Sequence, residues 1–351
     1  MTATTPPSPH EIRKALAENL NMRERDIADK LNISEAALIA AHTNDIATRV
    51  DAHPDAVMAV AQTFGEVMAL TRNPSCVNEK VGVYDNYHSG PHASMILTED
   101  IDLRIFPSHW HHAFMVEKET DTGTRRSLQV FDAAGDAVHK IFLRDGSDIS
   151  AWDVAKAKMR SNDQGATITV EARKPDETPK ADPAKRDILQ KEWARMTDTH
   201  QFMRLTSKLK MNRLGAYRIA GEPFVRALEV DAVDQMLHRV QESGIEVMIF
   251  TGNRGCIQIH SGPIGTLKGM GPWQNVMDPR FNLHLRLDHV AEVWAVEKPT
   301  QRGPAVSVEA FNATGGLIFQ VFGVGKEGRD SRPVWGELVK GLDGLKTQVP
   351  A

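Results

Sequence analysis

The chain contains an internal repeat at an offset of 180 residues. Residues 66–142 align with residues 246–322 without a gap. Because two copies of one sequence adopt one fold, the chain is predicted to form a pseudo-symmetric pair of units. A single function is then expected at positions where the copies differ. The shared residues include Glu66-Val67-Met68 with Glu246-Val247-Met248, Val116-Glu117-Lys118 with Val296-Glu297-Lys298, Cys76 with Cys256, and His109 with His289.

Each half combines helical periodicity with a run of short alternating segments. The first half predicts helices within 10–50, with Ser34 capping a helix over 35–41, and over 54–64 and 149–159. Its predicted strands are 67–70, 81–84, 94–97, 101–106, 113–117, 128–132 and 138–142. The second half predicts helices over 188–196, 199–209, 213–219, 233–243 and 333–342, with strands between 247 and 322. The fold class is therefore α+β, with a large antiparallel sheet flanked by helices in each half.

Proline and charge mark the boundaries of the two halves. Residues 1–9 carry three prolines and predict a disordered tail. Residues 173–186 carry three more prolines and many charges, which is typical of a linker. The predicted domains are thus an N-terminal repeat over 10–172 and a C-terminal repeat over 187–345.

Composition excludes several classes of protein. A net charge of −4 disfavours a general nucleic-acid binder. A segment over 23–36 has helix-turn-helix spacing, but the would-be recognition helix, 34–41, contains no Arg or Lys, so DNA binding is disfavoured. Cys76 and Cys256 are expected to be small core residues. We expect a cytoplasmic protein without signal peptide or membrane span.

Two places carry candidate functional side chains. In the strand 101–106, Asp102, Arg104 and Phe106 share one face, and a plain solvated face is the alternative. His200 follows the capping residues Thr197 and Asp198, so it is expected in the first turn of a helix, where the helix dipole disfavours a protonated imidazole. A neutral imidazole suits metal binding, whereas a purely structural histidine is the alternative. The first copy has Met22 at the corresponding place.

Four segments resemble the HemS/ChuS/HmuS family of cytoplasmic haem-handling proteins. They are IDLRIFPSHWHHAFMVEK (101–118), TDTHQFMRL (197–205), NRGCIQIHSGPI (253–264) and LHLRLDHVAEVWAVEKPT (283–300). The resemblance covers nearly the whole chain and includes the duplication. It implies that one haem b lies in a cleft between the two halves.

The resemblance also assigns roles to residues. It implies His200 as the axial ligand of the haem iron and Arg104 as the arginine on the other side of the haem, both of them catalytic. Arg213 and Lys298 match residues that hold the propionates, and further pocket positions match Phe106, Phe250 and Gln320. The chain departs from the family after Phe322: Gly325-Lys326 stands where an arginine is expected, so Lys326 is the natural substitute.

The implied activity is degradation of imported haem to release iron, with oxygen and an external electron donor. The alternative is a non-catalytic chaperone that passes haem to a separate oxygenase. Expected partners are haem, the cytoplasmic face of a haem ABC importer, and a reductase or haem oxygenase. A second metal or haem site is a further possibility at His88, His92, His109, His111 and His112, although the recurrence of His109 favours a structural role for that residue.

Overall fold

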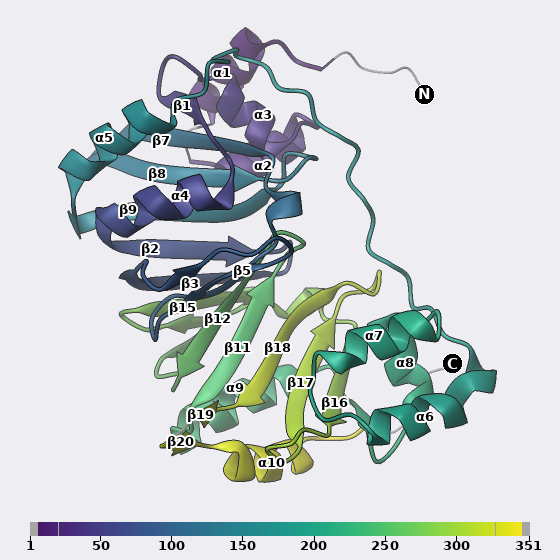
Figure 1. The fold of residues 1–351 in the computed structure, drawn as a ribbon. Coiled ribbons are helices and arrows are strands. Elements are labelled where there is room, and N and C mark those ends of the chain that lie inside the picture. Colours follow the sequence, from purple (N-terminus) through teal and green to yellow (C-terminus); the bar gives the residue numbers. More distant parts are fainter. Residues whose placement is uncertain (1–5, 20, 327, 346–351) are drawn as a thin grey trace. The chain divides into compact units, whose positions relative to one another are not determined.

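Two large antiparallel sheets with helices on their faces make up this computed structural model, which describes residues 6–19, 21–326 and 328–345 (Figure 1). The predicted α+β class is confirmed. The chain divides into two compact units. Unit 1 holds the described residues up to Arg72, Glu79–Lys174 and Gly252–Gln258, and unit 2 holds Asn73–Asn78, Pro175–Thr251 and the described residues from Ile259 onward.

Unit 1 contains a run of five strands in the order β1-β7-β8-β9-β2, each antiparallel to its neighbour. A second antiparallel run has the order β6-β5-β4. The strands are β1 (Ala47–Val50), β2 (Gly65–Arg72), β3 (Cys76–Val83), β4 (Tyr87–His88), β5 (Ser94–Leu97), β6 (Asp102–Ile105), β7 (His112–Thr120), β8 (Gly123–Phe131) and β9 (Ala137–Ser147). The helices are α1 (Pro9–Glu18), α2 (Glu24–Lys30), α3 (Glu35–Ala40), α4 (Pro54–Ala61) and α5 (Ile149–Met159).

Strand β7 shows why unit 1 needs helices on both faces of its sheet. Its residues alternate between two hydrophobic cores, as the two-residue period of a strand requires. Ala113 and Met115 pack in the core formed with α4 and α5. Phe114 and Val116 pack in the opposite core, formed with α1–α3. All four are buried, so each face of the strand contributes to stability through apolar burial.

Unit 2 repeats this plan with the order β10-β16-β17-β18-β11, again antiparallel throughout. The run β13-β14-β15 is the counterpart of β4-β5-β6. The strands are β10 (Val225–Leu228), β11 (Val247–Gly252), β12 (Cys256–Gly262), β13 (Leu267–Met270), β14 (Trp273–Met277), β15 (Phe281–Arg286), β16 (Glu292–Lys298), β17 (Ala305–Phe311), β18 (Leu317–Gly323), β19 (Gly325–Lys326) and β20 (Arg329–Asp330). The helices are α6 (Arg186–Ala194), α7 (Gln201–Lys208), α8 (Arg213–Ala220), α9 (Ala232–Ser243) and α10 (Arg332–Lys340).

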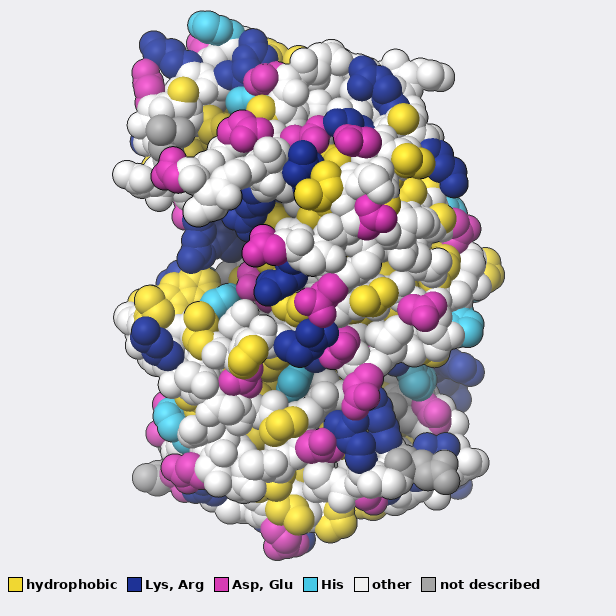
Figure 2. All heavy atoms as spheres, turned by 90° about the vertical axis from the view of Figure 1, so that its left-hand side faces the viewer, with side chains coloured by type: hydrophobic (Ala, Val, Ile, Leu, Met, Phe, Trp, Pro, Cys, Tyr) yellow, Lys and Arg dark blue, Asp and Glu magenta, His cyan; other side chains and the backbone are white. Residues whose placement is uncertain are grey.

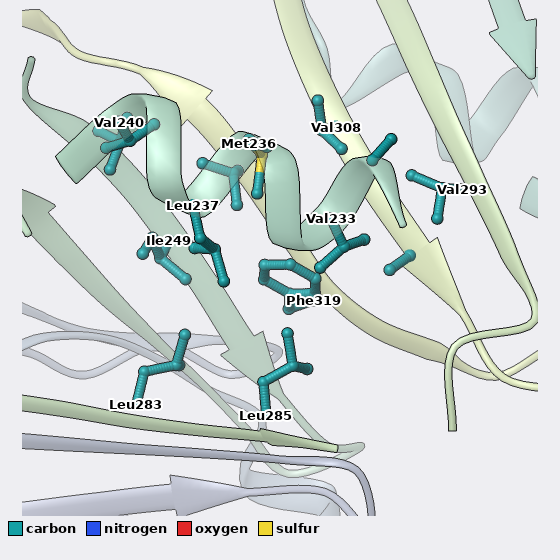
Figure 3. Close-up of a cluster of buried hydrophobic side chains, with 14 of the residues drawn as sticks. Val233, Met236, Leu237, Val240, Ile249, Leu283, Leu285, Val293, Val308 and Phe319 are labelled. Atoms are coloured by element: carbon teal, nitrogen blue, oxygen red, sulfur yellow. The ribbon is translucent and has the colours of Figure 1, made fainter. Parts of the chain in front are cut away.

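The two faces of the unit 2 sheet also belong to different cores. Val293 and Ala295 of β16 pack with α9 and α10, whereas Trp294 and Val296 pack with α6–α8. Figure 3 shows the first of these cores, where Phe319 of β18 lies under Val233 and its neighbours on α9. Phe319 is fully buried, and burying such a ring contributes roughly 1.5–3 kcal/mol.

Some of the predicted boundaries were wrong. Helical periodicity was expected to continue to Val50, but Ala47–Val50 forms β1 through antiparallel pairing with β7. The equivalent strand β10 was missed for the same reason: a four-residue edge strand lacks a pattern of its own and is defined by its partner. The predicted tail is also one residue too long, because α1 begins at Pro9 with Ser8 as its cap; residues 1–5 lie outside the described part.

The segment between the units is held by side-chain contacts to both units. Residues 161–182 contain no helix or strand in the structure, and a short 3-10 helix, Pro183–Lys185, precedes α6. Arg173 pairs with Asp136 in the β8–β9 turn of unit 1. Asp176 accepts hydrogen bonds from Asn312 and Thr314 in the β17–β18 turn of unit 2. The two ends of the segment therefore contact equivalent turns of the repeat, each in its own unit.

The surface matches the modest net charge of the sequence. Figure 2 shows one face, on which Lys and Arg side chains are interspersed with Asp and Glu. Within the described ranges, none of the helices has the length and apolar character that crossing a membrane requires.

Candidate functional site

His200 stands at the N-terminal end of α7 and is the N-cap residue, rather than a residue of the first turn as predicted. Asp198 lies two residues before it. A single carboxylate oxygen of Asp198 accepts hydrogen bonds from both the backbone N–H and the Nδ1 of His200, each at 2.7 Å. The His200 side chain is 91% exposed. The imidazole is therefore oriented by its own backbone turn and points outward from unit 2.

The Asp198 bond defines the tautomer of His200. Hydrogen bonds from the backbone and then the side chain of His200 lower the pKa of Asp198, so the carboxylate is ionised near neutral pH. An ionised carboxylate only accepts, so Nδ1 carries the proton. The nitrogen left to bind a metal ion is then Nε2, on the outer side of the imidazole. A carboxylate that bonds Nδ1 in this way orients a histidine to bind a metal ion through Nε2.

An aromatic cluster holds α7 against the unit. Phe202, two residues after His200, is 1% exposed. Its ring centroid lies 4.6 Å from that of Trp193 on α6 and 5.5 Å from that of Tyr217 on α8. Aromatic pairs at such distances add roughly 0.5–1.5 kcal/mol to simple burial. The position of His200 thus depends on the packing of three helices.

Beneath this cluster lies a set of buried polar side chains that we call the Glu309 network. The Glu309 carboxylate on β17 accepts hydrogen bonds from Arg213 Nη1 at 2.9 Å and Lys298 Nζ at 3.0 Å. Tyr217 and Ser307 also donate to it, each at 2.9 Å, and Lys298 donates to the Tyr217 hydroxyl at 2.9 Å. Glu309 is fully buried and Lys298 is 3% exposed.

The charges of the network are set by burial and by pairing. Burial alone would raise the pKa of Glu309, but the cations of Lys298 and Arg213 outweigh it and lower the pKa to about 2. Burial lowers the pKa of Lys298, and Glu309 opposes that shift. Burial raises the pKa of Tyr217, and the neighbouring carboxylate raises it further. The network therefore contains one carboxylate, two cations and a neutral phenol, with a net charge of +1.

Register across the sheet aligns two further predicted residues with Glu309. Glu309 pairs with Gln320 of β18, and Gln320 pairs with Phe250 of β11. Directly paired residues share a sheet face, so all three face the same side as Trp294, opposite α9 and α10. Gln320 and Phe250 are half-buried, and the Phe250 ring lies 5.3 Å from that of Phe322.

The structure thus brings five predicted site residues to one side of unit 2, the side on which α7 and α8 lie. His200 and Arg213 come from these helices, and Phe250, Lys298 and Gln320 come from the sheet. The two residues assigned to the propionates, Arg213 and Lys298, differ in how accessible they are to a ligand. Lys298 is buried and already bonded to Glu309 and Tyr217, whereas Arg213 keeps 24% of its side chain exposed. Direct propionate contact by either residue stays a prediction.

The remaining predicted residues lie elsewhere. Arg104 and Phe106 belong to unit 1, at β6 and just after it. Arg104 forms an ion pair with Asp102 and donates to the Leu103 carbonyl at 3.1 Å, with 32% of its side chain exposed. Lys326 is exposed in β19, part of a separate two-stranded sheet, where it pairs with Arg329. Their haem contacts stay predictions.

A second metal site finds no support in the described ranges, where no three His, Cys, Asp or Glu residues are placed to hold a metal ion. His88 bonds to Asn86, and His111 bonds to the Ser108 carbonyl. Both cysteines are fully buried, which confirms their predicted core role.

Glu309 and Tyr217 were missed by the reasoning from sequence. One signal was present: Glu309 is a charged residue within an apolar strand, and the first copy carries the polar Gln129 at the matching position, also buried. A polar residue at one buried position in both copies indicates a polar network. Its partners come from α8 and β16, and only the fold brings them together.

Comparison with known proteins agrees with this duplicated architecture. The chain matches the family model of the haemin-degrading HemS.ChuX domain over residues 32–159 and 210–342. It is 37% identical over 331 residues to the hemin transport protein HmuS of Yersinia pestis, covering 94% of this chain and 95% of that protein. Its structure resembles holo-PhuS, a heme-binding protein from Pseudomonas aeruginosa, with a TM-score of 0.91 and 38% identity over 97% of this chain and all of that one. It also resembles ChuS, an E. coli heme oxygenase, with a TM-score of 0.83 and 31% identity over 94% of this chain and 99% of that one. The chain belongs to the HemS family.

Proposed function

We propose that this protein binds haem through His200 and opens the porphyrin ring to release iron, using oxygen and an external electron donor. The observation that carries the proposal is the Asp198–His200 pair, which holds Nδ1 of an exposed imidazole and leaves its Nε2 outward. Haem recognition needs such a ligand, a cation for its carboxylates and apolar contacts for the macrocycle. On the same side of unit 2, Arg213 offers the cation and Phe250 the apolar contact.

The residues of unit 2 have distinct parts in this proposal. His200 binds the iron, and Asp198 holds the imidazole in the tautomer that can do so. Arg213 binds a carboxylate arm, while Phe250 and Gln320 contact the macrocycle. The bound iron supplies the redox chemistry. Arg104 is proposed to act on the other side of the haem. Phe106 is proposed to contact the macrocycle and Lys326 a propionate.

The ligand assignment is tested by titrating hemin into the wild type and His200→Ala and recording absorption spectra. His200→Ala is expected to lose the native ligation spectrum and most turnover. His238→Ala is the matched control, because His238 on α9 is also exposed and also lies beside an aspartate, Asp234. Unchanged spectra in His200→Ala, or an equal change in His238→Ala, would remove His200 from the proposal.

A non-catalytic haem chaperone is the second candidate, and the likeness to PhuS, a heme-binding protein, supports it, since a chaperone needs the same iron ligand and carboxylate contacts. The two functions are separated by giving the hemin-loaded protein a reductant, oxygen and catalase. Loss of the Soret band in the presence of catalase supports the enzyme. Loss that requires free peroxide supports the chaperone.

The proposal places the protein in the cytoplasm. It would receive haem at the cytoplasmic face of an ABC importer and take electrons from a reductase, or pass haem to an oxygenase. The family membership supports a role in haem utilisation. The external electron donor can be sought by adding purified flavin or ferredoxin reductases to the hemin-loaded protein and following the loss of the Soret band.

A further inference from the structure

Met203 is an exposed residue of α7, a helix whose other large apolar side chains are buried. It is 53% exposed, whereas Phe202 and Leu205 are 1% and 8% exposed. Met203 follows His200 by three residues, and helix residues three apart are neighbours on the helix surface. The thioether therefore belongs to the solvent side of α7, next to the exposed imidazole.

The sulfur of Met203 has a cationic neighbour. Nη2 of Arg213, the first residue of α8, lies 3.7 Å from the sulfur. The other terminal nitrogen of this guanidinium is anchored, because Nη1 donates to the buried carboxylate of Glu309 at 2.9 Å. A thioether is only a weak acceptor, so the contact uses little of the hydrogen-bonding capacity of Nη2. A stronger acceptor on the sulfur would thus find a donor already in place.

Two-electron oxidation of the thioether supplies such an acceptor. When methionine reacts with hydrogen peroxide, the O–O bond breaks, one oxygen forms a bond to sulfur, and the other leaves as water with both protons. The sulfur is oxidised, the peroxide is reduced, and the product is methionine sulfoxide, which is polar. The unbranched methionine side chain has three rotatable bonds, so it can turn the new oxygen toward Nη2. A donor 3.7 Å from the sulfur is close enough for an N–H···O bond of ordinary length to that oxygen.

We propose that Met203 is a peroxide-sensitive modification site, whose sulfoxide accepts a hydrogen bond from Nη2 of Arg213 and so ties α7 to α8. The site is independent of the proposed function, because neither the oxidation nor the new bond requires haem. Its effect falls on the helix that His200 caps. The modification is reversible, since methionine sulfoxide reductases restore the thioether.

The first test locates the oxidation. The full-length protein without hemin is treated with dilute hydrogen peroxide, and its peptides are analysed by mass spectrometry over time. Met203 should be oxidised at a rate within about threefold of that of Met270 on β13, which is 56% exposed. Met58 and Met236 are 0% exposed and should stay reduced while the protein is folded. A Met203 that is still reduced when Met270 is fully converted would overturn the proposal.

The second test detects the new bond through amide exchange of an α7 peptide. Oxidation should slow exchange of the α7 amides about fivefold, because a bond from a charged donor opposes opening of the helix. Methionine sulfoxide reductase should restore the original rate. Met203→Leu is the control: it conserves side-chain volume, cannot be oxidised, and passes through the same treatment with every other methionine intact. Unchanged or faster exchange in the oxidised wild type, or equal slowing in Met203→Leu, would refute the tie between the helices.

The third test identifies the donor. In Arg213→Lys a single ammonium replaces the planar guanidinium, so it can keep the bond to Glu309 but lacks the second edge. Oxidation should then leave α7 exchange unchanged, and slowing equal to that of the wild type would exclude Arg213. If this variant does not fold, Met203→Gln decides the matter without peroxide, because its amide oxygen should slow α7 exchange relative to Met203→Leu. All these measurements are made without hemin, so failure of haem binding leaves their outcome unaffected.

Discussion

Acid is expected to destabilise unit 1 through His139, a fully buried imidazole on β9. Its Nε2 lies 2.5 Å from the Tyr84 hydroxyl and its Nδ1 lies 2.8 Å from the Thr71 hydroxyl, which in turn donates to Gln258 at 3.0 Å. These bonds are satisfied by a neutral ring: Tyr84 donates to Nε2, and Nδ1–H donates to Thr71. Burial lowers the pKa of His139 from 6.5 to about 3.

The sign and size of the effect follow from proton binding. Between pH 6.5 and about 3 the unfolded chain binds a proton at His139 that the folded chain does not. Stability is therefore complete above pH 6.5 and decreases as the pH falls, by about 1.4 kcal/mol per pH unit within this window. Between pH 7 and pH 5, His139 alone should remove about 2 kcal/mol from the free energy of unfolding.

The second unit suggests how to remove this dependence. At the positions equivalent to Tyr84 and His139 it carries Ile264 and Phe319, both buried. The variant Tyr84→Ile/His139→Phe therefore replaces the pair with residues that the repeat already accommodates. It removes the titrating group and its hydroxyl partner together, which avoids leaving a buried hydroxyl unpaired.

The assay is denaturant unfolding of the wild type and the double variant at pH 7 and pH 5, with amide exchange of β9 peptides reporting on unit 1. Other titrating groups contribute to both proteins, so the quantity to compare is the difference in their pH dependence. The wild type should lose about 2 kcal/mol more than the variant. Equal losses, within about 0.5 kcal/mol, would show that His139 is not held neutral by the fold.

Three further outcomes are expected. Burial raises the pKa of both Cys76 and Cys256 to about 12, so a thiol reagent at pH 8 should label neither in the folded protein and both after denaturation. Gly215→Ala should lower the free energy of unfolding by roughly 1–3 kcal/mol, because a Cβ there would lie 2.0 Å from a backbone carbonyl, while Gly336→Ala in α10, where a Cβ meets open space, should not destabilise the protein in thermal melts. Asp198→Ala should raise the dissociation constant for hemin about tenfold in spectroscopic titrations, and an unchanged constant would contradict its orienting role.

Much of the fold could be predicted because strand alternation and helical periodicity are visible within short stretches of sequence. The alternation in β5 and β6 and the periodicity of α5 define these elements locally, and the predicted bounds of β5 and α5 match those of the structure. The duplication then extends each assignment to the other half. Strands β1 and β10 could not be predicted, since four residues without a distinctive pattern become a strand only when β7 or β16 lies beside them.

The candidate site could be predicted only in part. His200 and Arg213 were found through motifs that resemble a known family, and their immediate sequence indicated a helix start. The role of Asp198 as partner of the imidazole depends on the geometry of one turn, and Glu309 shows the same limit more clearly. Its partners Arg213, Lys298 and Ser307 are spread over nearly a hundred residues of sequence, and no local pattern links them.

The sequence by itself determined that this protein is a duplicated α+β chain of the HemS type, with His200 in one copy only. These features depend on residue identity and spacing, which a sequence states directly. The tertiary structure decided which charges are exposed and which are buried. Lys298 and Arg213 are both cations in the sequence and both contact Glu309 of β17, but the fold buries Lys298 and leaves part of Arg213 exposed. Burial and pairing are properties of neighbours in space, so they appear only once the strands and helices are packed.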